Sequence, residues 1–289
     1  MEKFLHWFQA EMPRPQVLGW FHIMWLMITV ISCTIIFIYR KQMSKKCVNL
    51  ILLIVGILLI LFEIYKQLEF SFNYNGGNGQ SYWKYQWYAF PFQFCSTPIY
   101  VMALAGILKK GKCYDCIISY LATYALFGGL VVLLYPYSVY TKVIGINIQT
   151  MFWHSSMLVV GFMLLATKSV DLHIKTLLKA SIVFVIMLAI ALTLNIVWHY
   201  CGNEETFNMF YISPYYECDM AVIGTIYNAV PYPIFLILYI LGFSFAVLII
   251  LYIAIGIDKL TALIADKQKH NNNNNNNNNN THNTSINTK

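Results

Sequence analysis

Two side chains in this sequence have the types needed for nucleophilic acyl chemistry, Cys95 and His154. Each lies inside a long apolar run, fourteen residues before a lysine that follows the run, Lys109 for the cysteine and Lys168 for the histidine. Two regular helices would therefore carry both groups about 21 Å from the same membrane surface. A thiol attacks as its thiolate, so a buried cysteine needs a base beside it. We expect His154 to be that base, with His199 as the competing candidate.

Further polar residues fall close to the same depth. Asn195, Glu63 and His22, counted from the basic residues that flank their own runs, lie about 24 to 27 Å from that surface. An ionisable group costs about 2.5 to 3.5 kcal/mol in the middle of a membrane, so a convergent set of them predicts a functional site. The predicted site has two catalytic residues, Cys95 and His154, and a supporting or substrate-binding set: His22, Glu63, Lys66, Gln93 and Asn195.

Simpler interpretations of the supporting residues stay open. Glu63 and Lys66 are spaced i, i+3 and can neutralise each other near the membrane interface. His22 is close to the end of its run, where a histidine reaches water. Asn195 can join two helices by a hydrogen bond and do no more. In the functional interpretation, Gln93 or Asn195 donates to a developing oxyanion.

The elements that would position these residues follow from composition. Of 289 residues, 58% are apolar and 11% charged, and the mean hydropathy is +0.58, which excludes an ordinary soluble domain. Runs of about 20 apolar residues cross a bilayer as helices. We expect an all-α, polytopic bundle of about seven transmembrane helices, at 18–39, 47–68, 87–108, 116–135, 146–167, 177–199 and 231–255.

The basic residues predict an orientation. Of the 19 lysines and arginines, 14 lie in the connections after the first, third and fifth spans and in the C-terminal tail. The positive-inside rule then places the N-terminus outside and the C-terminus in the cytoplasm. Three regions are expected: an interfacial N-terminal segment at 1–17, the membrane domain at 18–258, and a cytoplasmic tail at 259–289 whose asparagine run is disordered.

Partners and cofactors follow from the same pattern. The basic residues form no dense patch, so no nucleic-acid partner is expected. The expected partners are membrane lipids. Cys113 and Cys116 form a CxxC with no second ligand pair nearby, so neither a metal nor a cofactor is expected. A disulfide between Cys201 and Cys218 stays open, as does the oligomeric state.

At these residues the chain resembles the YwaF-like integral membrane family, which includes a transmembrane protein 164 acyltransferase. The matching stretches are GWFHIMW around His22, LFEIYKQ around Glu63, FPFQFCSTPIY around Cys95, FWHSSMLVVGF around His154, and LNIVWHY through NMFYISPY from Asn195 onward. The resemblance implies a seven-helix enzyme that moves a fatty acyl chain between phospholipids. It also implies that a cysteine matching Cys95 holds the acyl group as a thioester, and that a histidine matching His154 is its base.

The sequence therefore favours a multi-pass protein of the cell membrane that is an acyltransferase or lipid hydrolase. Two rivals are kept: a seven-helix receptor or sensor, and a small-solute transporter that binds its cargo at the polar layer. The receptor hypothesis is not supported by the expected motif. Seven-helix receptors carry an acidic-Arg-aromatic triplet at the end of the third span, whereas the third run here ends in Leu108 and two lysines. The last run, 231–255, also contains no lysine for a retinal Schiff base.

Overall fold

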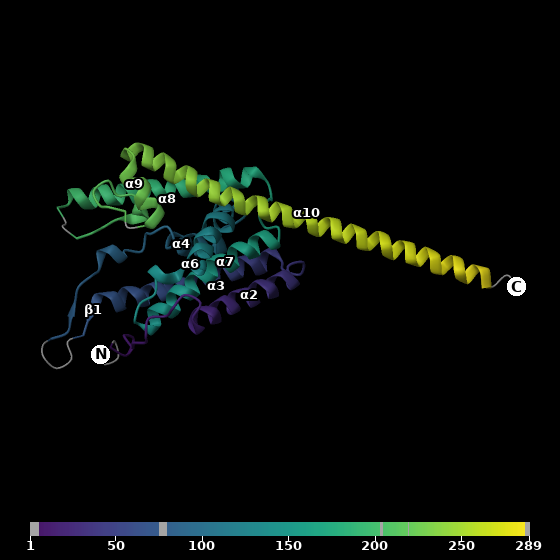
Figure 1. The fold of residues 1–289 in the computed structure, drawn as a ribbon, viewed down its shortest axis with the longest axis horizontal. Coiled ribbons are helices and arrows are strands. Elements are labelled where there is room, and N and C mark those ends of the chain that lie inside the picture. Colours follow the sequence, from purple (N-terminus) through teal and green to yellow (C-terminus); the bar gives the residue numbers. More distant parts are fainter. Residues whose placement is uncertain (1–5, 75–79, 203–204, 219, 287–289) are drawn as a thin grey trace.

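The computed structural model describes residues 6–74, 80–202, 205–218 and 220–286. Within these residues, six helical stretches are long and apolar enough to cross a membrane. They are α2 (Trp20–Tyr39), α3 (Lys45–Ser71), the continuous stretch Lys112–Leu134, α7 (Ile144–Ala166), α8 (Ile174–Tyr200) and the first part of α10 (Tyr232–Ile286). The helices lie side by side in one bundle (Figure 1). The chain is therefore an all-helical, multi-pass membrane protein apart from one small hairpin, β1 (Phe72–Asn73) paired with β2 (Tyr82–Trp83).

The third predicted span differs from the expectation. In place of one helix over 87–108, the structure has a short 3-10 turn, η1 (Trp87–Ala89), an irregular segment at 90–96, and the eleven-residue helix α4 (Thr97–Ile107). Prolines explain the break. Pro91 falls in the irregular segment, and Pro98 lies in the first turn of α4, where backbone N–H groups have no partner within the helix and a missing one costs little. Cys95 therefore does not lie on a regular helix, and its depth cannot be counted as if it did.

The stretch Lys112–Leu134 contains an irregularity of another kind. Its first part is α5 (Lys112–Tyr120), its last part is α6 (Leu126–Leu134), and a five-residue π-helix, η2 (Leu121–Ala125), joins them. All five residues of η2 are buried. The π-turn lies at the centre of the main hydrophobic core, and such turns are often found at functional sites.

Two helix pairs approach each other closely because a glycine faces the partner. A Cβ atom at Gly56 of α3 would lie 2.5 Å from the Ala103 backbone nitrogen of α4. A Cβ at Gly129 of α6 would lie 2.6 Å from the His154 carbonyl oxygen of α7. Small residues at such crossings let two helix backbones approach closely. In lipid this close packing is what holds helices together, because no hydrophobic force drives apolar surfaces to associate there.

One end of the bundle is tied together by the N-terminal segment. Residues 1–5 lie outside the described residues, so the interfacial helix expected at 1–17 is described only from residue 6 onward, as a short turn and an extended stretch. Met12 N–H donates to the Lys142 carbonyl at 2.7 Å, and Ile144 N–H donates to the Ala10 carbonyl at 2.9 Å. The segment therefore pairs with the connection before α7, which also contains a 3-10 turn, η3 (Pro136–Ser138).

The C-terminal helix is longer than the membrane requires. The sequence predicts disorder in the asparagine run, whereas α10 continues as a helix through that run to Ile286 and projects far beyond the bundle (Figure 1). Propagating a helix that has already formed avoids the cost of nucleation. Near the point where α10 leaves the bundle, Asp258 forms an ion pair of 2.8 Å with Lys168, which follows α7.

Candidate functional site

Cys95 lies in the irregular segment just before α4, with its side chain partly buried. Its backbone carbonyl accepts a hydrogen bond of 2.7 Å from the indole Nε1 of Trp153 on α7. Trp153 is 3% exposed, and a buried indole N–H usually requires such a partner. The bond fixes the backbone of the cysteine against the helix that carries His154.

His154 is buried, 6% exposed, and one of its ring nitrogens is committed. Nδ1 lies 2.7 Å from the Thr150 carbonyl oxygen, one turn earlier on α7. A carbonyl only accepts, so Nδ1 carries the proton and Nε2 of the neutral ring has a lone pair. Nε2 is therefore the nitrogen that can accept a proton. Within the described residues, no hydrogen bond joins either ring nitrogen to the Cys95 thiol.

Gln93 and Asn195 hold a loop. Gln93 Nε2 donates to the Asn208 carbonyl at 2.9 Å, and its Oε1 accepts from Phe210 N–H at 2.8 Å. Asn195 is fully buried and bonds both backbone groups of Met209, donating to the carbonyl at 3.0 Å and accepting from the N–H at 2.7 Å. The side-chain oxygen and one N–H of each amide are thus bonded to backbone, and the second N–H of each is the donor that the predicted oxyanion role would use.

The loop that they hold, residues 207–213, follows α8 and enters the bundle. It contains the 3-10 turn η4 (Met209–Tyr211), and Phe210 has a left-handed backbone with φ of 59°. Tyr239 on α10 donates to the Phe210 carbonyl at 3.0 Å, and Tyr232 donates to the Ile212 carbonyl at 2.7 Å. Irregular backbone is tolerated at membrane depth only where protein or water satisfies it, and here side chains from three elements do so.

His22 joins two helices. It is 1% exposed, so the interpretation of a histidine that reaches water is wrong. Nδ1 accepts from Leu18 N–H at 2.9 Å, and the opposite nitrogen, Nε2, lies 2.8 Å from the Leu133 carbonyl at the end of α6. An accepting Nδ1 leaves Nε2 as the protonated donor of the neutral ring. Both nitrogens serve backbone groups, which places His22 in the framework.

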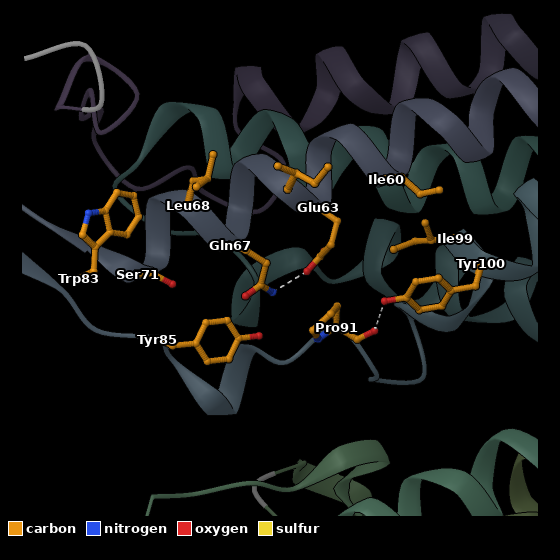
Figure 2. Close-up of a pocket in the computed structure, with 11 residues that line it drawn as sticks. Ile60, Glu63, Gln67, Leu68, Ser71, Trp83, Tyr85, Pro91, Ile99 and Tyr100 are labelled. Carbon is orange, nitrogen blue, oxygen red and sulfur yellow. Dashed lines mark hydrogen bonds between the residues drawn. The ribbon is translucent and has the colours of Figure 1, made fainter. Parts of the chain in front are cut away.

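Glu63 and Lys66 pair with each other, as the simpler interpretation allows. Lys66 Nζ lies 2.9 Å from Glu63 Oε1, which also accepts a hydrogen bond of 2.6 Å from Gln67 Nε2. Glu63 Oε2 is buried and has no hydrogen bond within the described part of the chain. Glu63 lines a cavity of about 560 Å³. Figure 2 shows this cavity between α3 and the segment that includes Tyr85 and Pro91.

The structure therefore separates the predicted polar layer into distinct sets. Trp153, the neighbour of His154 on α7, bonds the Cys95 carbonyl. Gln93 and Asn195 hold the loop, and His22 joins α2 to α6. Glu63 pairs with Lys66 and lines a cavity. Of the seven predicted site residues, Glu63 alone is among the described residues that line that cavity.

Sequence reasoning missed two parts of the polar interior. Asn208 holds its own loop, accepting from Ser213 N–H at 2.8 Å. Tyr120, at the start of the π-turn, lies 2.8 Å from the hydroxyl of Thr97, two residues after the cysteine. One signal was present: Tyr120 and Tyr124 interrupt an apolar run at a spacing of one helical turn.

Comparisons with known proteins place this geometry in a family. Comparison with curated proteins and with solved structures gives no significant match. The model of the TMEM164 family matches residues 17–255, which covers all six long apolar helices up to the middle of α10. The chain belongs to the TMEM164 family.

Proposed function

We propose that this protein is an integral membrane acyltransferase or lipid hydrolase that carries a fatty acyl chain as a thioester on Cys95, with His154 as the base. One observation supports it most directly: the bond of 2.7 Å from Trp153 to the Cys95 carbonyl fixes the cysteine against the residue next to His154. The tautomer set by Thr150 adds to this, because it keeps the Nε2 lone pair for proton transfer.

The proposed reaction has two steps. His154 Nε2 takes the thiol proton, and the thiolate attacks the carbonyl carbon of a lipid ester. The ester C–O bond breaks, and the leaving lyso-lipid oxygen takes the proton from the imidazolium. In the second step an alcohol gives its proton to His154 and attacks the thioester, and Cys95 leaves as thiolate and is reprotonated. Water as the acceptor gives a free fatty acid, which is the hydrolase outcome.

The geometry requires a side-chain movement before reaction. Successive residues on a helix point about 100° apart, so Trp153 and His154 face different neighbours. Since no hydrogen bond joins thiol and ring in the described residues, the two side chains must approach each other when substrate binds, and a movement of the cysteine keeps the His154 bond to Thr150. Catalytic hydrogen bonds commonly tighten only in the substrate complex.

The transporter and receptor alternatives gain no comparable support. A solute site built on Gln93 and Asn195 needs their polar groups free, whereas both side chains are bonded to the backbone of the loop 207–213. The proposal includes membrane lipids as substrates, the cell membrane as location, and an N-terminus outside. The charge distribution of the sequence supports this orientation.

A trapping experiment tests the nucleophile. Purified full-length protein is reconstituted with phospholipid labelled in one acyl chain, and the protein is then examined for label that neutral hydroxylamine releases, as it does from a thioester. We expect labelled wild type, no label on Cys95→Ala, and a rate of acyl transfer at least a hundredfold lower in that variant.

A matched control uses a second cysteine in the membrane. Cys33 on α2 is also partly buried, and Cys33→Ala should keep both the label and the transfer rate. His154→Gln should slow the formation of the labelled species while leaving Cys95 able to accept label slowly. An unchanged transfer rate in Cys95→Ala would remove the proposed nucleophile.

A further inference from the structure

Six lysines at one end of the bundle are exposed and form no ion pair within the described residues. They lie in the stretches 40–49 and 108–116, which contain the connection from α2 to α3, the connection from α4 to α5, and the first turns of α3 and α5. These six residues, the lysine cluster, are Lys41, Lys45, Lys46, Lys109, Lys110 and Lys112.

Helix packing brings the two stretches together. A Cβ atom on Gly106, one residue before the end of α4, would lie 2.6 Å from the Leu53 Cβ in the third turn of α3. The end of α4 therefore lies beside the start of α3. The Tyr114 hydroxyl in the first turn of α5 donates to Asn49 Oδ1 on α3 at 2.7 Å, so the start of α5 lies there too. Lysines that are distant in the sequence thus belong to one surface.

Acidic side chains leave this surface with an excess of positive charge. Asp115 is the only acidic residue in the two stretches, and its carboxylate lies 3.9 Å from Lys179 of α8, outside the cluster. Lys168, by contrast, has a close partner in Asp258 at 2.8 Å. The positive-inside rule explains why lysines gather at one end of a membrane protein. It does not require that one group of them lack counter-charges.

Helix geometry adds to the positive potential. α3 begins at Lys45 and α5 begins at Lys112, so the partial positive charges of two helix N-termini lie in the cluster. A lysine in the first turn is unfavourable for its own helix, because that position favours negative charge. A bound anion would relieve the repulsion among the lysines and also their conflict with the two helix dipoles.

The level of the cluster in the membrane indicates what carries the anion. The apolar run of α3 begins at Cys47, directly after two of the lysines. Leu50 and Ile54, one and two turns further along α3, are largely exposed and face lipid. The charge therefore lies at the level of lipid headgroups, with an apolar surface beside it. A phospholipid supplies an anionic headgroup and apolar chains at these two levels, whereas a soluble polyanion uses the charge alone.

The number of lysines favours a headgroup with several charges. A phosphate diester carries one negative charge, whereas each phosphomonoester adds about 1.5 to 2 at pH 7. We propose that the lysine cluster binds the headgroup of a phospholipid that carries phosphomonoesters, of the phosphoinositide class, from the adjoining leaflet. The interaction uses no residue of the proposed acyl chemistry and goes beyond it.

A binding measurement tests the proposal. Full-length protein in neutral detergent is titrated with a fluorescent, short-chain phosphatidylinositol bisphosphate, and fluorescence anisotropy reports the bound fraction. Each lysine near an anionic membrane surface contributes about a fivefold gain in affinity, so a variant lacking four should bind about a hundredfold or more weakly. These side chains hold no other group in the described residues, and the variant should fold. It combines Lys45→Gln, Lys46→Gln, Lys109→Gln and Lys110→Gln.

A matched control removes the same charge outside the cluster. It should weaken binding by less than about fivefold, because those lysines do not contact the headgroup. A second control, Cys95→Ala, should bind the lipid as wild type does, so failure of the acyl-transfer proposal leaves this one intact. The matched control combines Lys168→Gln, Lys175→Gln, Lys259→Gln and Lys267→Gln.

Competition identifies the source of the phosphate groups. The unlabelled bisphosphate lipid should displace the probe at about tenfold lower concentration than free inositol trisphosphate, which lacks apolar chains, or phosphatidylserine, which carries fewer charges. Binding should also weaken about tenfold between about 0.1 M and about 0.5 M salt. Equal displacement by the free headgroup, stronger displacement by polyglutamate, or an equal loss of affinity in the two quadruple variants would overturn the proposal.

Discussion

Replacing Asn195 by leucine should open the loop at 207–213 while leaving the bundle folded. Leucine has the same branched skeleton as asparagine, with bulkier methyl ends, and it removes both hydrogen bonds to Met209, at 2.7 and 3.0 Å. Met209 is fully buried, so water cannot replace them in the native arrangement. An unpaired buried backbone group costs about 1–3 kcal/mol, and two such groups cost about 2–6 kcal/mol.

That cost is large for one loop and small for the whole bundle, so we expect local opening. Amide hydrogen exchange of the purified protein measures it. Because about 1.4 kcal/mol corresponds to a factor of ten, peptides covering 207–213 should exchange roughly 30-fold to 20,000-fold faster in Asn195→Leu. Peptides from α3 and α7 should exchange as in wild type.

A control on the same helix separates this effect from damage to α8. Thr193 is exposed and its hydroxyl bonds only to the Ala189 carbonyl one turn earlier. Thr193→Ala should change exchange at the loop by less than threefold, because surface substitutions usually alter stability by less than about 0.5 kcal/mol.

Gln93→Leu removes two other hydrogen bonds to the loop. In the double variant with Asn195→Leu, the free-energy change of opening should be less than the sum of the two single changes. Unchanged exchange of 207–213 in Asn195→Leu would refute the reasoning.

Two further predictions concern the framework. His22→Leu leaves the Leu133 carbonyl and a backbone N–H unpaired in a buried site, so thermal denaturation in detergent should show a loss of about 2–4 kcal/mol, and a melting temperature equal to wild type would contradict the assignment. Gly129→Ala places a Cβ 2.6 Å from the His154 carbonyl and should cost about 1–3 kcal/mol by separating α6 from α7. Gly242→Ala meets open space and should be neutral or stabilising by up to about 1 kcal/mol, and equal effects of the two glycine variants would show that the close crossing is unimportant.

The long apolar helices could be predicted because a membrane constrains them in one simple way. A span must be apolar over about 20 residues, and this condition can be read from composition alone. The predicted runs at 18–39 and 146–167 accordingly agree with α2 and α7 to within two residues. The run at 87–108 meets the same condition, yet its first half is irregular: prolines break the helix there, and the Cys95 carbonyl is bonded by Trp153 instead. The prolines indicated this break, and apolar length alone did not.

The candidate site was harder to predict because depth is only one of the coordinates that bring side chains together. Counting residues along a helix gives height above the membrane surface, whereas the direction of a side chain turns by about 100° at every residue. Trp153 and His154 differ in height by a single residue, and it is Trp153 that bonds to Cys95. Asn195 and Glu63 were assigned similar heights, but one faces the loop at 207–213 and the other the cavity beside α4. A polar layer in a membrane sequence therefore indicates groups that need partners, and the packing of the helices decides whether those partners are substrate, loop backbone or each other.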